Sequence, residues 1–189
     1  MNIVAVIPTG NRPKEYQSVI DWCYDHNVTP ITIATSEEAD KYAVGAYISN
    51  RELNISKWWN LGIQRARQDF NPDYILVLND DVQLPEGWLR QMVAAMLATG
   101  SSGASGQRGG KNLISGYAFI LDAYGTDADE NLVWWYGDDD IQRQCELADG
   151  FYIVPNIRVK NLYGNSSVSR FAEQIEKDRI FFEQKWSIK

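Results

Sequence analysis

The sequence predicts an α/β fold in which helices flank a doubly wound, Rossmann-like sheet. Two short apolar runs, over residues 2–7 and 74–78, have the near-continuous hydrophobicity typical of parallel strands that are buried on both faces. Amphipathic helical stripes alternate with such runs, and the connections between them are short. With 189 residues, 44% of them apolar, the chain can bury a sizeable core, and we expect residues 1–189 to form a single domain.

The first half of the chain alternates strands with helices. The first strand ends at Pro8, and Pro13 then occupies a position where helices often begin. Apolar residues at helical spacing from Tyr16 to Cys23 predict a helix that ends near Asn27. In order, we expect strands over residues 2–7, 29–34, 46–48 and 74–78, and helices over residues 13–26, 55–70 and 85–97.

The pattern changes after residue 98. Residues 99–112 are rich in Gly and Ser, and we expect a mobile loop there, of which residues 100–111 close over a bound ligand. Three apolar runs, over residues 114–121, 132–136 and 151–154, predict further strands of a mixed sheet. From Ser169 onward, apolar residues share one stripe and predict a C-terminal amphipathic helix.

Charge and composition exclude several classes of protein. Asp and Glu outnumber Lys and Arg by 25 to 18, and this net charge of −7 disfavours nucleic acid as the main ligand, because phosphate binding relies on basic residues. No apolar run approaches the roughly 18 residues of a membrane-spanning helix, so we expect no membrane span. The first residues lack the pattern of a secretory signal, and Cys23 and Cys145 allow one disulfide at most. We therefore expect a cytoplasmic protein with reduced thiols.

Polar segments follow three of the expected strands, at residues 8–13, 79–81 and 137–140. Ligands of open α/β sheets bind beyond the carboxyl ends of the strands. Asp80 and Asp81 are adjacent carboxylates that repel each other unless a cation lies nearby. Mg²⁺ or Mn²⁺ carrying a diphosphate would supply that charge. The alternative is a solvated turn between a strand and a helix.

The three consecutive acids Asp138, Asp139 and Asp140 follow a Trp-rich apolar run. A carboxyl group near such surroundings has its pKa raised toward neutrality, which suits a general base. The alternative is an acidic surface loop. Other kinds of site have less support, because the single histidine lies at a helix end and the two cysteines are far apart in the sequence. Residues 106–110 match neither a Walker loop nor a dinucleotide fingerprint.

The ordered set of motifs resembles glycosyltransferase family 2, whose members have the GT-A fold. Members begin with a strand that ends in a V-I-P-T-x-N-R-P-like segment, and their metal motif is a strand followed by D-D-D or N-D-D and a P-x-G-W-L helix. Later motifs are an E-D pair, a G-Y, a V-P and a final F-x-x-K-W. The matching segments here are VAVIPTGNRP at 4–13, KWWNLGI at 57–63, YILVLNDDVQLPEGWL at 74–89, Asp138-Asp139, Gly150-Phe151, Val154-Pro155 and FEQKW at 182–186.

This sequence departs from the family pattern at three places. Trp58 and Trp59 replace the A-R of the helix motif, which leaves Lys57 as the nearest cation. Asn161 falls where some relatives carry a metal-binding His, so metal binding would rest on Asp81 and substrate phosphates. Ile141 stands where a second acid of the later motif is common.

The resemblance implies roles for individual residues. Asp81 would coordinate Mn²⁺ or Mg²⁺, with Asp80 on the ribose or the donor sugar. Asp139 would be the catalytic base, with Asp138 as the second choice. We expect the nucleotide to be bordered by residues at the ends of the first two strands and by two residues of the following helix, namely Pro8, Thr9, Arg12, Thr35, Lys57 and Asn60. Trp134, Trp135 and Tyr136 would form a stacking wall for the acceptor, unless the Trp pair packs in the core.

The implied activity is metal-dependent transfer of a sugar from a nucleoside-diphosphate sugar, with a UDP-sugar as the first choice, to an acceptor hydroxyl. The enzyme would be of the hexosyltransferase type, with inversion at the anomeric carbon. Residues 1–98 would bind the nucleotide and residues 99–189 an acceptor that the sequence does not identify. Two alternatives remain open at this point: a nucleotidyltransferase of similar fold, and a non-catalytic module that binds a nucleotide or glycan.

Overall fold

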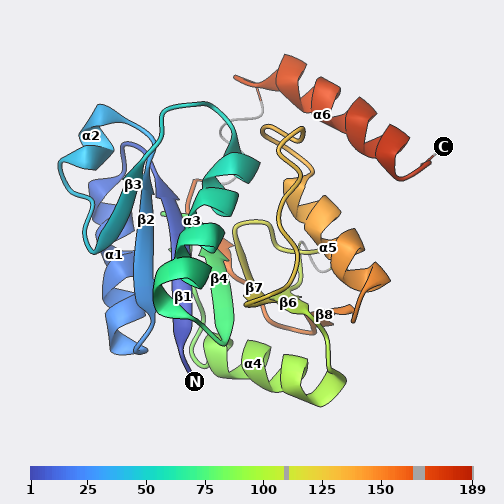
Figure 1. Cartoon of the computed structure of the whole chain (residues 1–189), viewed down its shortest axis with the longest axis horizontal. Helices are drawn as coiled ribbons and strands as arrows, with labels where there is room; N and C mark the ends of the chain where they lie inside the picture. The colour runs from blue at the N-terminus through green and yellow to red at the C-terminus, as the bar shows by residue number, and fades with distance from the viewer. Residues whose placement is uncertain (109–110, 164–168, 189) are drawn as a thin grey trace.

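The computed structural model describes residues 1–108, 111–163 and 169–188. A seven-stranded sheet with the order β3-β2-β1-β4-β7-β6-β8 runs through the molecule (Figure 1). Strand β7 runs antiparallel to both of its neighbours, and the other pairs in this sheet are parallel. The strands are β1 (Ile3–Thr9), β2 (Thr29–Ala34), β3 (Ala46–Ser49), β4 (Tyr74–Leu78), β6 (Gly103–Gly106), β7 (Ala118–Asp122) and β8 (Phe151–Val154). A separate antiparallel pair joins β5 (Val82–Gln83) to β9 (Lys160–Asn161).

Helices cover both faces of the sheet because its strands bury apolar side chains alternately on either side. In β1, Ile3, Ala5 and Ile7 pack toward α1 (Pro13–Asp25) and α4 (Trp88–Thr99). Val4 and Val6 pack toward α3 (Ile55–Phe70) and α5 (Gly137–Leu147) on the opposite face. The short α2 (Glu37–Asp40) follows β2, and α6 (Ala172–Lys185) lies outside the sheet, beyond α5 (Figure 1).

The predicted fold class is confirmed, including the C-terminal helix. The strands expected at residues 29–34 and 74–78 have those bounds, and helix α3 occupies residues 55–70 as expected. The helix expected from Pro85 begins at Trp88, because Gly87 before it adopts a left-handed φ of 70°. The strand expected over 114–121 covers only Ala118–Asp122. No described helix combines the length and the hydrophobicity needed to cross a bilayer, and both cysteines are free and buried.

The prediction of a mobile loop over residues 99–112 is wrong for residues 103–106. These residues form β6, a buried strand between β7 and β8. Packing demands the small side chains: a Cβ on Gly103 would lie 2.6 Å from Cδ2 of Phe151, and one on Gly106 would lie 2.6 Å from the carbonyl oxygen of Ile157. The composition that is typical of a loop therefore reflects close packing here. Gly109 and Gly110, which belong to the segment expected to close over a ligand, lie outside the described residues.

The prediction of a strand over residues 132–136 is also wrong. The segment does not form a strand, and the acids after it belong to the first turn of α5. Its backbone groups bond elsewhere: the amides of residues 133–135 donate to the Asp178 carboxylate, while the carbonyl of Val133 accepts from the amide of Ile55. Tyr136 then adopts a left-handed φ of 65° immediately before the helix.

The first prediction concerns the contact between α3 and β1. A Cβ on Gly62 would lie 2.2 Å from Cγ1 of Val6. We expect Gly62→Ala to lower the free energy of unfolding by about 1–3 kcal/mol through overpacking, even though Ala gains about 1 kcal/mol over Gly in helix propensity. Urea denaturation of the variant and the wild type measures the difference.

The matched control is Gln64→Ala, an exposed position of the same helix, which should change the free energy by less than about 0.5 kcal/mol. Combining Gly62→Ala with Val6→Ala should cost less than the sum of the two single changes, because the second change removes the methyl groups that clash. A Gly62→Ala chain more stable than the wild type would contradict the packing described.

Candidate active site

A cleft of about 870 Å³ opens at the carboxyl ends of β1, β2 and β4. Strand β1 lies between β2 and β4 there, and the connections that leave β1 and β3 run on opposite faces of the sheet. Ligands of open α/β sheets usually bind at such a point. Residues from the second half of the chain line the other side of the cleft. Of the residues expected from the sequence, those that line it are Pro8, Thr9, Arg12, Thr35, Asp80, Asp81, Trp134, Trp135, Tyr136, Asp138 and Asp139, together with Asn161.

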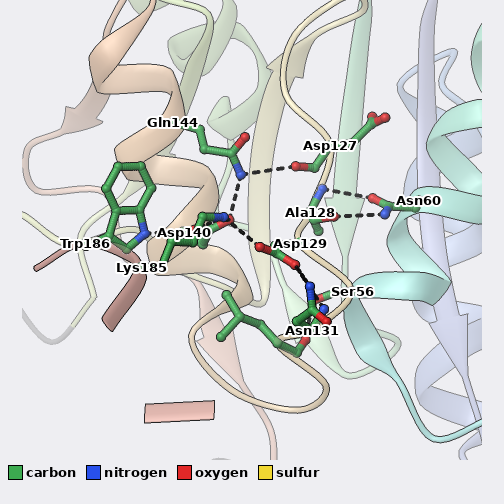
Figure 2. A network of polar contacts seen from close by, with 11 residues as sticks. Ser56, Asn60, Asp127, Ala128, Asp129, Asn131, Asp140, Gln144, Lys185 and Trp186 are labelled. Atoms are coloured by element: carbon green, nitrogen blue, oxygen red, sulfur yellow. Dashed lines mark hydrogen bonds and ion pairs between the residues drawn. The ribbon is translucent and has the colours of Figure 1, made fainter. Parts of the chain in front are cut away.

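Two expected donor-site residues, Lys57 and Asn60, are not among the described residues that line the cleft. The Lys57 ammonium forms an ion pair with Glu52. The Asn60 side chain donates to the carbonyl of Ala128 and accepts from its amide, both at 2.9 Å, so it fastens α3 to the loop before α5 (Figure 2). Asn60 is thus in contact with the second half of the chain rather than with the cleft.

One arginine neutralises the acids at the end of β4. Nη1 of Arg12 lies 2.6 Å from Oδ2 of Asp81 and 3.4 Å from Oδ1 of Asp80. The hydroxyl of Thr9 donates to Oδ2 of Asp80 at 2.8 Å. Burial raises the pKa of both carboxyls, and the Arg12 guanidinium opposes that rise. The Arg12 guanidinium also lies over the ring of Tyr163, 4.6 Å from its centroid.

The Asp80–Asp81 pair fits a divalent cation that is held jointly with a substrate. Oδ1 of Asp81 is buried and has no hydrogen-bond partner among the described residues, so it is an oxygen ligand without a partner. No group of three or more His, Cys, Asp or Glu side chains suited to a metal occurs in the described part of the chain. Mg²⁺ is commonly held by one or two carboxylates and substrate phosphates, which is the donor set available here.

A second arginine, Arg108, pairs with the acids at the start of α5. Its Nη1 lies 3.1 Å from Oδ2 of Asp138, and its Nη2 lies 2.7 Å from Oδ1 of Asp139. Burial, together with the neighbouring Asp139 charge, raises the pKa of Asp138 to about 7, against the effect of Arg108. Gly116 makes room for this carboxylate, since a Cβ there would lie 2.1 Å from Oδ2 of Asp138. Sequence reasoning missed Arg108, whose only signal is its position as a cation within a Gly-rich segment.

The third acid of this cluster, Asp140, faces away from the cleft. It is fully buried, and its carboxylate accepts from the side chains of Gln144, Lys185 and Trp186 (Figure 2). The three acids that are consecutive in sequence therefore have two different environments, two of them in the cleft and one beneath α6.

Aromatic side chains form the wall of the cleft opposite β1. The Trp134 ring packs at 4.3 Å from that of Phe171 and meets Trp58 edge-on at 6.1 Å. The Tyr136 ring stacks on that of Phe182 at 5.1 Å. The rings of Trp134 and Tyr136 thus take part in packing and also line the cleft.

The chain belongs to glycosyl transferase family 2. The family model described as "Glycosyl transferase family 2" matches residues 32–156, and no curated protein matches the sequence.

Solved structures show the same GT-A fold. S. aureus TarS 1–349 superposes with a TM-score of 0.63 at 9% identity, covering 84% of this chain and 59% of that one. The same protein in complex with UDP gives a TM-score of 0.63 at 10% identity, again over 84% and 59%. A197 from STIV gives a TM-score of 0.58 at 11% identity, over 86% of both chains. The present chain thus spans about three fifths of the TarS 1–349 structure.

The second prediction concerns the buried carboxyl of Asp138. Its pKa in the folded state, about 7, lies above the ordinary value of 3.8, so the folded state holds a proton that the unfolded state has lost between those values. Stability should therefore fall as pH rises through this window. Asp138→Asn removes the effect, so the variant should gain stability over the wild type as pH rises from 4 to 8.

Urea denaturation at several pH values measures this difference. The control is Gln64→Ala, an exposed position without a titratable group, for which the difference from the wild type should not change with pH. A constant difference between Asp138→Asn and the wild type across the range would contradict the raised pKa.

Proposed function

We propose that this protein is a glycosyltransferase that moves a sugar, of the hexosyl type, from a nucleoside-diphosphate sugar to an acceptor hydroxyl. The observation that carries the proposal is that two carboxylate pairs, Asp80–Asp81 and Asp138–Asp139, line one cleft at the ligand-binding edge of the sheet. Membership of glycosyl transferase family 2 supports it.

The donor lies, in this proposal, across the ends of β1 and β2. Pro8, Thr9 and Thr35 border the nucleoside, and Asp80, held by the Thr9 hydroxyl, accepts from the ribose or the donor sugar. Arg12 is the proposed cation for the diphosphate. Lys57, the other candidate cation, forms an ion pair with Glu52 outside the cleft. A structural neighbour in complex with UDP supports uridine as the first nucleoside to test.

A divalent cation, Mn²⁺ or Mg²⁺, completes the donor site in this proposal. Asp81 would hold it through the oxygen that has no partner, and Asp80 is the adjacent carboxylate. When bound, such an ion acts as a Lewis acid that neutralises charge on the departing nucleoside diphosphate. Arg12, already within 2.6 Å of Asp81, is placed to contribute positive charge to the same diphosphate.

Asp139 is the proposed catalytic base. Its carboxylate is paired with Arg108 at 2.7 Å and lines the cleft. It takes the proton of the acceptor hydroxyl while the hydroxyl oxygen bonds to the anomeric carbon and the bond from that carbon to the diphosphate oxygen breaks. A single displacement of this kind inverts the anomeric configuration. Asp138, whose pKa is about 7, keeps its proton for part of the population near neutral pH and so reduces repulsion of Asp139.

The third prediction tests the donor and its metal. Isothermal titration calorimetry with a panel of nucleoside diphosphates should show binding in the presence of Mn²⁺, strongest for UDP. Asp81→Ala should remove the metal-dependent part of the affinity and leave the fold intact, because it deletes the proposed metal ligand. Asp149→Asn should bind as the wild type does. An Asp81→Ala chain whose affinity for UDP depends on Mn²⁺ as strongly as that of the wild type would refute the metal role.

The fourth prediction tests the base. Hydrolysis of a UDP-sugar, with water as the acceptor, should fall by about 10²- to 10⁴-fold in Asp139→Asn, the usual contribution of a general base, while UDP affinity is retained. The sugar released by the wild type should have the inverted anomeric configuration, as read by NMR immediately after turnover. Retained turnover in the variant, or a product of retained configuration, would overturn the mechanism. A chain that binds UDP but turns over no donor would favour the alternative of a non-catalytic module that binds a nucleotide.

A further inference from the structure

Residues 132–136, three of which line the cleft, come directly before the acidic turn at residues 137–140. Contacts on two sides hold this segment in place. Residues 132–136 do not form a strand, so their backbone groups bond to partners other than a sheet ladder. The carbonyl of Leu132 accepts from the hydroxyl of Ser56 at 2.6 Å, and the carbonyl of Val133 accepts from the amide of Ile55 at 2.8 Å. The start of α3 therefore satisfies the acceptors of this segment on one side.

A single carboxylate satisfies the donors on the other side. Asp178 of α6 is 1% exposed. Its Oδ2 accepts from the amides of Trp134 and Trp135 at 2.7 and 2.8 Å, and its Oδ1 accepts from the amide of Val133 at 3.2 Å. Gln174, one turn earlier in α6, donates to Oδ1 at 2.7 Å. A buried carboxylate with four donors is well satisfied, and it fixes three consecutive residues of backbone.

Helix α6 also holds the acidic turn itself. Nε1 of Trp186 donates to Oδ1 of Asp140 at 2.8 Å, and Nζ of Lys185 lies 2.8 Å from the same oxygen (Figure 2). Asp140 follows Asp139 directly in the first turn of α5. The residues that line the cleft, from Trp134 to Asp139, therefore lie between two attachments to α6.

We propose that Asp178 is a positioning residue for the reaction. By accepting the three amides of residues 133–135, it sets the position of the aromatic wall and of the turn that presents Asp138 and Asp139 to the cleft. Asp178 does not line the cleft, and it is more than 40 residues away in sequence from the segment that it holds. The inference rests on the proposed function only where turnover is measured; the placement of the turn is tested separately.

The test variant is Asp178→Asn. The amide keeps one acceptor oxygen but turns an NH₂ group toward the backbone amides, so one side of the attachment becomes repulsive. Hydrogen exchange followed by mass spectrometry should show faster exchange at residues 133–135, extending into residues 137–140. Affinity for UDP with Mn²⁺ should stay within about twofold of the wild type, because the nucleoside lies at β1 and β2. The kcat for UDP-sugar hydrolysis should fall by about 10- to 100-fold, the order expected for misplacement of a reacting group.

The matched control is Glu173→Gln, which removes an acidic charge from the exposed side of α6, where Glu173 is paired only with Lys177 in the interactions described. It should leave exchange, UDP affinity and kcat as in the wild type. Gln174→Met is a milder second variant, for the case that Asp178→Asn does not fold. It keeps the buried Asp178 carboxylate and removes only the side chain that donates to it, so this chain should fold. We expect it to lower kcat by about threefold, with faster exchange at residues 133–135.

The outcomes separate the two proposals. A kcat within twofold of the wild type in both variants, with faster exchange at residues 133–135, would overturn the positioning role. Unchanged exchange in both would also overturn it, because Asp178 would then not hold the segment. A wild type that neither binds UDP nor hydrolyses any donor refutes the proposed function, and exchange at residues 137–140 alone then decides whether Asp178 places the turn.

Discussion

Neutralisation of buried carboxylates by two arginines is the interaction on which the cleft depends. Asp80 and Asp81 are 6% and 2% exposed, and repulsion between such neighbours has to be offset by a cation. Arg12 offsets it on one side of the cleft and Arg108 on the other, where it contacts Asp138 and Asp139. Each guanidinium contacts two carboxylates, so one arginine offsets the charge of each acidic pair.

The two acidic pairs are placed by different physics. Asp80 and Asp81 follow a central strand, which is fixed by its ladders with β1 and β7 and by apolar packing on both faces. Asp138 and Asp139 lie in the first turn of a helix, where the helix dipole favours negative charge. No ladder fixes that helix start, so its place depends on side-chain contacts with α3 and α6. One wall of the cleft is consequently set by the sheet and the other by polar attachments.

This difference explains what the sequence could and could not predict. Apolar runs and helical stripes are local signals, so the strands at residues 29–34 and 74–78 and the helix at residues 55–70 were predicted to the residue. The run at 132–136 is equally apolar, but its amides bond to Asp178, a partner that no local pattern reveals. Strand β6 was missed because packing against Phe151 and Ile157 requires Gly where β-branched residues would signal a strand. Arg108 was missed because its partners, Asp138 and Asp139, are about 30 residues away in sequence.

Attachment of α6 through polar groups has a consequence for how the site could vary. The buried residues of this helix are Asp178 and Phe182, so a carboxylate takes part in its docking beside one buried ring. A hydrogen bond adds only about 1 kcal/mol of net stability, whereas a buried polar group left without a partner costs more. Such contacts therefore favour one geometry of α6 without binding it strongly. Substitutions on α6 can therefore shift the aromatic wall while the apolar sheet that carries Asp80 and Asp81 stays in place. In the proposed function, the side of the cleft that binds the donor is thereby separated from the aromatic wall that would face the acceptor.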